Sequence, residues 1–406
     1  MNVLVVGSGG REHALVWKLA TSTGVRSLHA APGNPGLAPL ATCHPVSATD
    51  PEGLLALCRE HAIELVVVGP EAPLVAGAGD VLRAAGVAVF GPSRAAARIE
   101  ASKAFGKDVM LAAGVPTART LAAPRAPCVV KLDGLASGKG VWVCPSQHDA
   151  DEAWARARAA GGRVLVEELL EGEEVSLFVV TDGRRTAVLP AARDAKRLGD
   201  GDAGPNTGGM GAYSPIPSVG DEALGELAER IAEPVLAELA RRGAPFVGLL
   251  YAGLMLTDDG PRVLEFNCRF GDPETQAILP RLEVDLLELL AGAAAGRLPA
   301  GRPRASEEAT VAVVLAAPGY PEAPRTGIPI GGLAAAHARG VLVFHAGTDV
   351  HDGRLVSSGG RVLTVVGRGP SLEDARACAY AAVGEIELPG GHHRSDIAAG
   401  GVRVAP

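Results

Sequence analysis

The amino-acid sequence predicts a multidomain protein that combines a parallel α/β domain with α+β domains. The chain has 406 residues, more than one hydrophobic core usually organises, so two to four domains or subdomains are expected. Its first hundred residues alternate short Val-rich runs with amphipathic stretches, which is typical of a parallel sheet covered by helices. After about residue 117, short strand-like runs are joined by turns and a Gly-rich loop, a pattern typical of α+β units.

The composition and charge of the chain exclude several classes of protein. A formal net charge of −8 gives no general attraction to nucleic acid or anionic membranes, so we expect small-molecule partners and no nucleic acid. The six cysteines form no C-x-x-C pair and none of the spacings of a structural zinc site, which indicates reduced thiols. No apolar run approaches the ~18 residues of a membrane span, and the first residues lack a signal-peptide pattern. We therefore expect a cytoplasmic protein. We also expect a monomer.

An N-terminal parallel α/β domain that binds substrate is expected over residues 1–100. Each candidate strand is followed by turn residues at its carboxyl end, the edge where ligands lie in open α/β sheets. The first of these turns is Gly7-Ser8-Gly9-Gly10. The candidate strands span residues 3–6, 27–30, 65–68 and 87–90.

The turn after the first strand leads directly into a helix, so its backbone N–H groups are suited to hold a phosphate. The turn resembles a dinucleotide-binding fingerprint only in part, because Glu12 occupies the third glycine position and no acid follows the second strand. A phosphorylated substrate is therefore favoured over NAD, and a purely structural turn is the remaining alternative.

A second domain is expected over residues 101–300, with a small lid subdomain at about 117–183. Its first helix, 102–113, leads into the lid, and a long loop over 194–217 precedes an amphipathic helix at 221–242. The other predicted elements are strands at 128–131, 141–144, 164–167, 175–181, 248–256 and 262–266, and helices at 149–160 and 273–292.

A C-terminal α+β domain is expected over residues 301–406. It follows the Arg302-Pro303 pair, and no internal sequence repeat is evident. Its predicted elements are strands at 310–316, 341–346 and 361–367 and a helix at 371–385.

A Gly-rich loop joins the first two strands of the predicted lid. The segment from Lys131 to Val141 reads KLDGLASGKGV, with three residues between Gly and Gly-Lys where a Walker P-loop has four. Since both flanking runs are strands, the loop belongs to a hairpin that can close over a triphosphate, where glycines let backbone donors approach the oxygens. Lys131 would add a positive charge from the strand. The alternative is an exposed, flexible hairpin with incidental lysines.

Two acidic segments follow this hairpin. The first, VEELLEGEE over 166–174, can offer backbone groups to an adenine edge and a carboxylate to ribose hydroxyls, or it is a solvated acidic turn. In the second, Glu265 and Asn267 lie two apart on a strand, so they share a face and supply the hard oxygen ligands that suit Mg²⁺. Arg269 on that face is suited to neutralise a transferring phosphoryl group, although an ordinary polar strand face gives the same pattern.

The long loop over 194–217 contains the words DAKR and GPNTGGMGAY. Loops of this length in compact enzymes usually contact substrates, and a disordered surface excursion is the alternative. No nucleophile elbow or Cys–His arrangement accompanies His13, His392 and His393, so we expect these histidines at the surface or in turns.

In combination, the Gly-rich hairpin, the acidic hinge EELLEGEE and the strand EFNCR stand in the order of the ATP-grasp fold, which this chain resembles. Further words extend the resemblance nearly from end to end: GGREH at 9–13, VGPEAPL at 68–74, SKAF at 102–105, APGYP at 317–321 and FHAGT at 344–348. Together they closely resemble the phosphoribosylamine–glycine ligase (glycinamide ribonucleotide synthetase) family of purine biosynthesis.

This resemblance implies a pre-ATP-grasp N-terminal domain, an ATP-grasp domain with its lid, and an ADP-forming carbon–nitrogen ligase. ATP would convert glycine to glycyl phosphate, and the amine of 5-phosphoribosylamine would attack it to give glycinamide ribonucleotide, ADP and phosphate. The implied cofactors are ATP and Mg²⁺ or Mn²⁺.

The resemblance also implies roles for residues at matching positions. The ATP-binding residues would be Lys103, Lys131, Ser137, Gly138, Gly140, Glu168, Leu170 and Glu174. The catalytic residues would be Arg269, Asp194 and Lys196, and the metal ligands Glu265 and Asn267. The residues around glycine and phosphoribosylamine would be Gly9, Gly10, Arg11, Glu12, Arg197, Asn206, Gly208, Gly209, Met210 and Asp272.

Two features depart from the family pattern. Only ten residues separate Thr120 from Lys131, so the lid is expected to be shorter than in relatives, and Ala195 stands where relatives carry a histidine. The alternative within the fold is another purine-pathway ATP-grasp ligase with a different carboxylate substrate. The shortened lid leaves open a catalytically silent binding protein, and the incomplete glycine fingerprint disfavours a Rossmann-type oxidoreductase.

Overall fold

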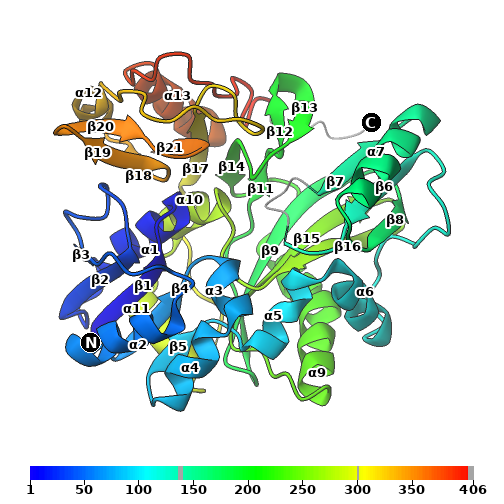
Figure 1. The fold of residues 1–406 in the computed structure, drawn as a ribbon, viewed down its shortest axis with the longest axis horizontal. Coiled ribbons are helices and arrows are strands. Elements are labelled where there is room, and N and C mark those ends of the chain that lie inside the picture. Colours follow the sequence, from blue (N-terminus) through cyan, green and yellow to red (C-terminus); the bar gives the residue numbers. More distant parts are fainter. Residues whose placement is uncertain (136–139, 300, 401–406) are drawn as a thin grey trace.

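The computed structural model describes residues 1–135, 140–299 and 301–400. At the N-terminus, five strands form a wholly parallel sheet in the order β3-β2-β1-β4-β5 (Figure 1). The parallel α/β prediction is thus confirmed, and the two-residue strand β3 was missed because it is too short to give a sequence pattern. The strands are β1 (Asn2–Gly7), β2 (Ser27–Pro32), β3 (Thr42–Cys43), β4 (Leu65–Val68) and β5 (Ala88–Phe90).

Both faces of this sheet are buried, which explains its unbroken Val-rich runs. Leu4 and Val6 pack toward helices on one face, while Val3 and Val5 pack on the other, because successive strand side chains alternate. One covering helix comes from much later in the chain. The helices are α1 (Gly10–Leu19), α2 (Pro51–Glu60), α3 (Glu71–Ala76), α4 (Ala78–Ala84), α5 (Arg94–Ala101) and α11 (Leu286–Ala294).

The middle of the chain builds a four-stranded antiparallel sheet in the order β10-β9-β15-β16. Its strands are β9 (Glu173–Thr181), β10 (Thr186–Val188), β15 (Gly248–Thr257) and β16 (Gly260–Asn267), and it packs with α6 (Lys103–Ala112). The helix predicted at 221–242 is not uniform: α8 (Asp221–Leu227) and α9 (Glu233–Arg241) flank a π-helical turn, Ala228–Ala232. Pro234 explains the interruption, because it has no N–H to continue the α-helical hydrogen bonds.

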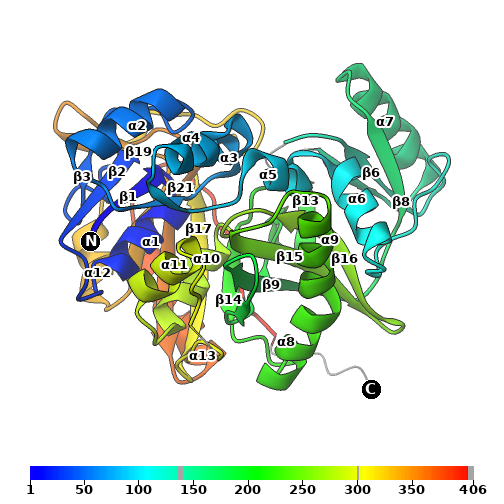
Figure 2. The same ribbon diagram turned by 90° about the horizontal axis from the view of Figure 1, so that it is seen from below.

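The predicted lid is a three-stranded sheet, β7-β6-β8, covered by one helix. Figure 2 shows this unit at one end of the molecule. The predicted hairpin is confirmed, since β6 pairs antiparallel with β7 from Cys128 opposite Cys144 to Lys131 opposite Val141. The elements are β6 (Cys128–Leu132), β7 (Val141–Cys144), α7 (Gln147–Ala159) and β8 (Val164–Glu168).

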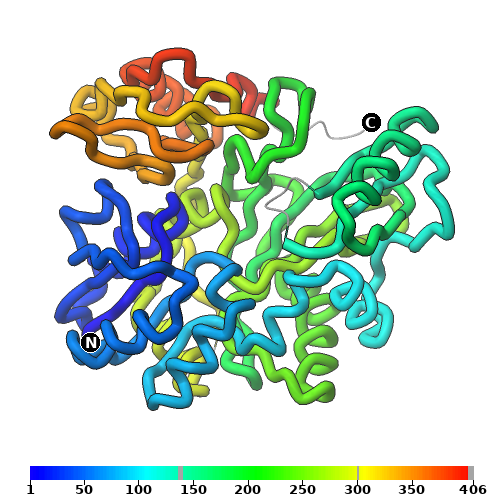
Figure 3. Tube along the Cα trace, in the orientation of Figure 1, coloured from blue at the N-terminus to red at the C-terminus, as the bar shows by residue number. Residues whose placement is uncertain are grey.

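The C-terminal sheet has the order β11-β14-β17-β21-β18 and takes two strands from the middle of the chain. The loop predicted at 194–217 was therefore wrong, because the strand partners of β14 (Gly211–Ser214) lie about a hundred residues later, in β17 (Ala309–Ala316). Figure 3 shows the mid-chain segment, in green, beside the C-terminal segment. The remaining elements are β11 (Arg193–Asp194), β12 (Arg197–Gly199), β13 (Ala203–Asn206), α12 (Leu333–Ala338), β18 (Leu342–His345), β19 (Thr348–His351), β20 (Arg354–Ser357), β21 (Arg361–Gly369) and α13 (Leu372–Val383), with a 3₁₀ turn at Asp200–Asp202.

The helix predicted at 273–292 is also divided. It consists of α10 (Glu274–Ile278), a 3₁₀ turn at Leu279–Arg281, and α11. Asp285 begins a new helix by accepting hydrogen bonds from the backbone N–H groups of Leu287 and Glu288, at 2.9 and 3.3 Å. Within the described residues, no helix is long and apolar enough to cross a membrane.

Candidate active site

A cavity of about 1290 Å³ opens between the lid hairpin, the antiparallel sheet and the β12–β13 ribbon. Most residues predicted for the site line it, although they come from separate parts of the chain. Ser137 and Gly138 lie outside the described residues, and Gly9, Gly10, Glu12, Gly209 and Met210 do not line this cavity. The predicted residues that line it are Arg11, Lys103, Lys131, Gly140, Glu168, Leu170, Glu174, Asp194, Lys196, Arg197, Asn206, Gly208, Glu265, Asn267, Arg269 and Asp272.

Lys131 projects from β6 into a network that the sequence did not reveal. The Glu167 carboxylate contacts the ammonium groups of both Lys131 and Lys107 at 2.6 Å, and all three side chains are almost fully buried. Lys131 also donates to the carbonyl oxygen of Leu264 at 3.0 Å. One carboxylate thus balances only one of two lysine charges, which leaves positive charge at the cavity wall.

Lys103 stands at the start of α6, beside the Gly-rich hairpin. Its ammonium donates to the carbonyl oxygen of Gly134 at 2.9 Å. Burial lowers the pKa of Lys103, although Glu265 opposes that effect. A triphosphate entering under the hairpin would meet the ammonium groups of both Lys103 and Lys131.

The acidic hinge uses its first carboxylate for structure. Glu168 accepts hydrogen bonds from the backbone N–H and the Nε of Arg119, at 2.9 and 2.6 Å. Burial alone would raise the pKa of Glu168, but these hydrogen bonds outweigh it and hold the pKa below its usual range. The side chain of Glu168 is therefore occupied, and its backbone N–H also donates to the carbonyl oxygen of Arg119 at 3.0 Å.

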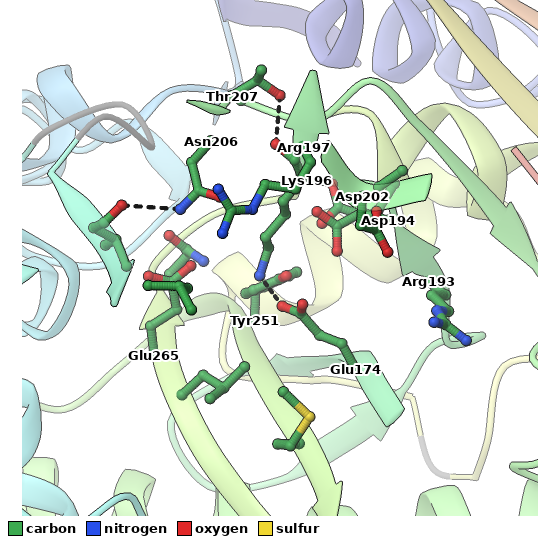
Figure 4. Close-up of a pocket in the computed structure, with 18 of the residues that line it drawn as sticks. Glu174, Arg193, Asp194, Lys196, Arg197, Asp202, Asn206, Thr207, Tyr251 and Glu265 are labelled. Carbon is green, nitrogen blue, oxygen red and sulfur yellow. Dashed lines mark hydrogen bonds and ion pairs between the residues drawn. The ribbon is translucent and has the colours of Figure 1, made fainter. Parts of the chain in front are cut away.

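Lys196 lies at the centre of the cavity with carboxylates around it (Figure 4). It forms an ion pair with Glu174, which raises the pKa of its ammonium against the lowering effect of burial. Burial raises the pKa of Asp194 well above its usual range. The Oδ1 atom of Asp194 is buried without a hydrogen-bond partner among the described residues, so it can accept a donor from a ligand.

Glu265 and Asn267 lie on one face of β16 and line the cavity, as predicted from their spacing. Burial would raise the pKa of Glu265, but Lys196, Lys131, Lys103 and Arg269 outweigh it and keep the carboxylate ionised. Within the described residues, no group of three or more His, Cys, Asp or Glu side chains is placed to hold a metal. One ionised carboxylate and one amide oxygen nonetheless fit a hard divalent cation that takes its other ligands from phosphates.

Arg269 lines the cavity and lies between the carboxylates of Glu71 and Glu100, neither of which was predicted as a site residue. Its Nε lies 3.1 Å from Glu71 and its Nη2 lies 2.8 Å from Glu100. Burial would lower the pKa of Arg269, but Glu100 and Glu71 raise it above its usual value. The guanidinium is thus permanently charged and fixed in orientation. The signal for Glu71 in the sequence is a glutamate in a turn that follows a predicted strand, as in VGPEAPL.

The glycine turn after β1 differs from the prediction. The Gly9 N–H, expected to hold a phosphate, donates instead to the Glu12 carboxylate at 2.6 Å. Glu12 also accepts from the Nε of Arg11 at 2.6 Å, and it fits there because a Cβ on Gly69 would lie only 2.1 Å from its Oε1. A carboxylate from the start of α1 therefore fills the position that the prediction gave to a ligand.

The loop from Asn206 to Met210 is held from two sides. Asn206 donates to the Val141 carbonyl of the lid hairpin at 3.0 Å. From the C-terminal domain, the Tyr320 hydroxyl accepts the Gly208 N–H at 3.0 Å, and Arg361 Nη1 donates to the Gly208 carbonyl at 2.5 Å. The loop thus joins three parts of the molecule at the cavity.

Comparison with protein families divides the chain into three matched segments. Residues 1–100 match the phosphoribosylglycinamide synthetase N domain, residues 101–275 its ATP-grasp (A) domain, and residues 310–400 its C domain. The phosphoribosylamine–glycine ligase of Streptomyces coelicolor is 53% identical and aligns over 98% of this chain and 99% of its own length. The phosphoribosylamine–glycine ligase of Mesorhizobium japonicum is 48% identical and aligns over 98% of this chain and 97% of its own length.

Solved structures give the same relationship. The crystal structure of phosphoribosylamine–glycine ligase from Thermotoga maritima superposes with a TM-score of 0.83 and 34% identity, covering 98% of this chain and all of that one. N5-carboxyaminoimidazole ribonucleotide synthetase from the same organism, at 18% identity and a TM-score of 0.65, covers 95% of this chain and 99% of its own, and shares the fold.

Proposed function

The chain belongs to the phosphoribosylglycinamide synthetase family, and from this premise we infer how its own residues perform the family's reaction. It is an ADP-forming phosphoribosylamine–glycine ligase of purine biosynthesis, and it uses ATP with a divalent metal ion. The single observation that carries the assignment of roles is that Lys103 and Lys131, the β16 oxygen donors and Lys196 all face one cavity.

We propose that ATP lies under the lid hairpin. Lys103 and Lys131 would contact its phosphates, since both ammonium groups are at the wall beside the hairpin. The backbone of Glu168 and Leu170 would meet the adenine, and Glu174 would hold the ribose after exchanging its contact with Lys196. Gly140, with Ser137 and Gly138, would cover the phosphates.

The metal would be held by Glu265 and Asn267, and we propose Mg²⁺ or Mn²⁺ because both donors are hard oxygen atoms. When bound, the ion would neutralise charge on the transferring phosphoryl group. Lys103, Lys131 and Lys196 already keep the Glu265 carboxylate ionised, so this ligand is ready to bind a cation near neutral pH.

The acyl-transfer steps need positioning and charge neutralisation rather than a side-chain nucleophile. We propose that a carboxylate oxygen of glycine attacks the γ-phosphorus of ATP and that ADP leaves. The nitrogen of phosphoribosylamine then attacks the carbonyl carbon of glycyl phosphate, and inorganic phosphate leaves. Arg269 and Lys196 would neutralise the developing charge, and the unpaired Oδ1 of Asp194 would accept a hydrogen bond from an amine.

The remaining predicted residues are proposed to surround the two acceptor substrates. Arg11, Arg197, Asn206, Gly208 and Asp272 line the cavity directly. Gly10, Glu12, Gly209 and Met210 would act by shaping the turn and the loop behind it.

We also propose that the enzyme is a cytoplasmic monomer and that its domains span residues 1–100, 101–300 and 301–406, with the lid at about 117–183. The three family segments support divisions near residues 100 and 300. The pairing of β6, β7 and β8 into a separate small sheet supports the lid.

Substrate omission tests the proposed function. ADP release should require ATP, glycine, phosphoribosylamine and a divalent metal together. Replacement of glycine by formate or bicarbonate should abolish it. ADP formation at an equal rate without glycine would contradict the substrate assignment, and activity with bicarbonate would favour a different carboxylate substrate.

A further inference from the structure

Lys107 is a buried lysine at the wall of the large cavity, and none of the proposed roles uses it. It lies on α6, and Figure 2 shows this helix beside the lid. Its side chain is only 7% exposed. Because a buried lysine charge costs free energy unless it has partners, the partners of this ammonium group indicate its role.

All three N–H groups of the Lys107 ammonium have acceptors. Its Nζ lies 2.6 Å from a Glu167 carboxylate oxygen, 2.8 Å from the Thr117 hydroxyl oxygen and 2.7 Å from the Ala118 carbonyl oxygen. The Thr117 hydroxyl donates in turn to the Val263 carbonyl oxygen at 2.8 Å, so its own oxygen can accept. Three acceptors match the three donors of a charged ammonium group, whereas a neutral amine has only two. Lys107 is therefore charged, and its donors are all used within the protein.

Glu167 divides its carboxylate between two lysines. Its Oε1 faces Lys107 and its Oε2 faces Lys131, each at 2.6 Å. Lys131 also donates to the Leu264 carbonyl oxygen at 3.0 Å, so two of its three N–H groups have acceptors among the described residues. The third N–H group is left for a ligand in the cavity that Lys131 lines.

The charges of these three side chains decide what a phosphate group would meet. Two ammonium groups and one carboxylate leave a net positive charge at the cavity wall. Without the charge of Lys107, the Glu167 carboxylate would cancel the charge of Lys131, and a triphosphate would meet a neutral ion pair. Because all three side chains are almost fully buried, solvent would screen this difference only weakly.

Lys107 also connects the lid to the strand that carries the proposed metal ligands. Through Thr117, at the entry to the lid, it is tied to β16, with which Thr117 forms a parallel bridge. Through Glu167 it is tied to Lys131, whose other acceptor, the Leu264 carbonyl, is on the same strand. Lys131 and β16 are thus held in one frame.

We propose that Lys107 is a positioning residue for ATP binding: it takes up the negative charge of Glu167, so that the ammonium of Lys131 stays available to the phosphates. Lys107 itself does not contact them. This inference rests on the proposed function, which places ATP under the lid hairpin.

Removal of the Lys107 charge tests this role. Lys107→Met and Lys107→Gln should each raise the Kd for ADP at least about tenfold, because Glu167 would then neutralise Lys131. The Kd for adenosine, which has no phosphate, should stay within about twofold of wild type in both variants. Lys107→Arg keeps the charge, so its Kd for ADP should lie within about threefold of wild type. Equilibrium dialysis with Mg²⁺ present measures both ligands.

Lys18→Met is the matched control, because it removes the same charge from a half-buried lysine outside the cavity. Its Kd values for ADP and adenosine should both match wild type. The Tm of each variant shows whether it is folded. If Lys107→Met does not fold, Lys107→Gln, which retains hydrogen-bond donors without the charge, carries the same test.

The dialysis measurement needs neither glycine nor phosphoribosylamine, which separates this inference from the proposed function. If the wild type binds ADP but releases no glycine-dependent ADP, the proposed function fails, while a selective loss of ADP binding still supports the role of Lys107. An unchanged Kd for ADP in the uncharged variants, an equal loss of ADP and adenosine binding, or no recovery in Lys107→Arg would overturn the inference.

Discussion

Glu265 is the residue on which the metal assignment depends most. Three lysines and Arg269 keep its carboxylate ionised, so a half-buried negative charge stands ready at the cavity to bind a cation. We expect Glu265→Gln to lower kcat about 10²- to 10³-fold, the usual effect of removing one charge-stabilising group from a reaction centre. Steady-state ADP release measures this change.

The control is Glu307→Gln, an exposed glutamate outside the cavity, which should retain wild-type activity. Circular dichroism and Tm should show that Glu265→Gln is folded, and higher Mg²⁺ should recover part of its activity. Near-normal turnover of Glu265→Gln would remove this residue from the metal site.

The sequence predicted the residues that would contact ligands better than the residues that hold them. Glu265, Asn267 and Lys131 stand in short words with a local spacing, and the structure places all of them at the cavity. Lys107 and Glu167, which fix Lys131, were not predicted. Their contact joins a helix to a strand about 60 residues later, and no local pattern reveals such a pair.

The loop between β13 and β14 is tightly constrained at Gly209. Gly209 has a φ of +108°, and a Cβ there would lie 2.5 Å from the Cδ of Pro273. We expect Gly209→Ala to destabilise the protein by about 1–3 kcal/mol and to lower activity, because the loop must shift away from Pro273. Thermal unfolding and ADP release measure the two effects.

Gly225→Ala is the matched control, because a Cβ at Gly225 in α8 would meet nothing within 4 Å. This variant should be as active as wild type and slightly more stable, since alanine favours a helix over glycine. If Gly209→Ala behaved in the same way as Gly225→Ala, the proposed constraint on the loop would be refuted.

Elements with a strong periodic pattern were predicted closely. The strands at 65–68 and 141–144 coincide with β4 and β7. The ribbon β12–β13 was missed because its polar, Gly-rich strands carry no alternating pattern. Likewise, the helix at 273–292 was predicted as one because its apolar residues continue past Pro280.

At the scale of the whole molecule, two buried histidines join the first and last domains. His13 in α1 was expected at the surface or in a turn, but it is buried against Phe344 and His345, and its Nδ1 accepts the His345 N–H at 2.9 Å. Burial lowers the pKa of His13 to about 3 and that of His345 to about 4. Both side chains are therefore neutral in the folded protein at physiological pH.

This interface makes stability depend on pH. In the unfolded chain each histidine binds a proton near pH 6.5, while in the folded protein it does so only near pH 3 to 4. The contribution of these histidines to the free energy of unfolding should thus be fully present above pH 6.5. It should fall by about 1.4 kcal/mol per pH unit for each histidine as the pH decreases toward 4. Denaturant unfolding at pH 7, 6 and 5 measures this slope.

His13→Asn keeps a hydrogen-bond acceptor but removes one titrating group, so its stability should decline less steeply with acid than that of wild type. The control is His351→Asn, whose side chain is 82% exposed and should leave the slope unchanged. Equal slopes for His13→Asn and wild type would show that the interface does not take part in the pH dependence.

The two mid-chain strands in the C-terminal sheet bear on how this chain can be divided. Because β14 pairs with β17, a recombinant fragment ending near residue 300 would keep β11 and β14 with a bare, apolar edge, and the complementary fragment would lose part of its own sheet. Neither fragment could fold autonomously into the form it has in the intact enzyme. Because the C-terminal sheet contains strands from the middle of the chain, the large cavity and the C-terminal domain depend on one continuous polypeptide. A fusion partner can therefore be added at either terminus, but a break near residue 300 would separate paired strands.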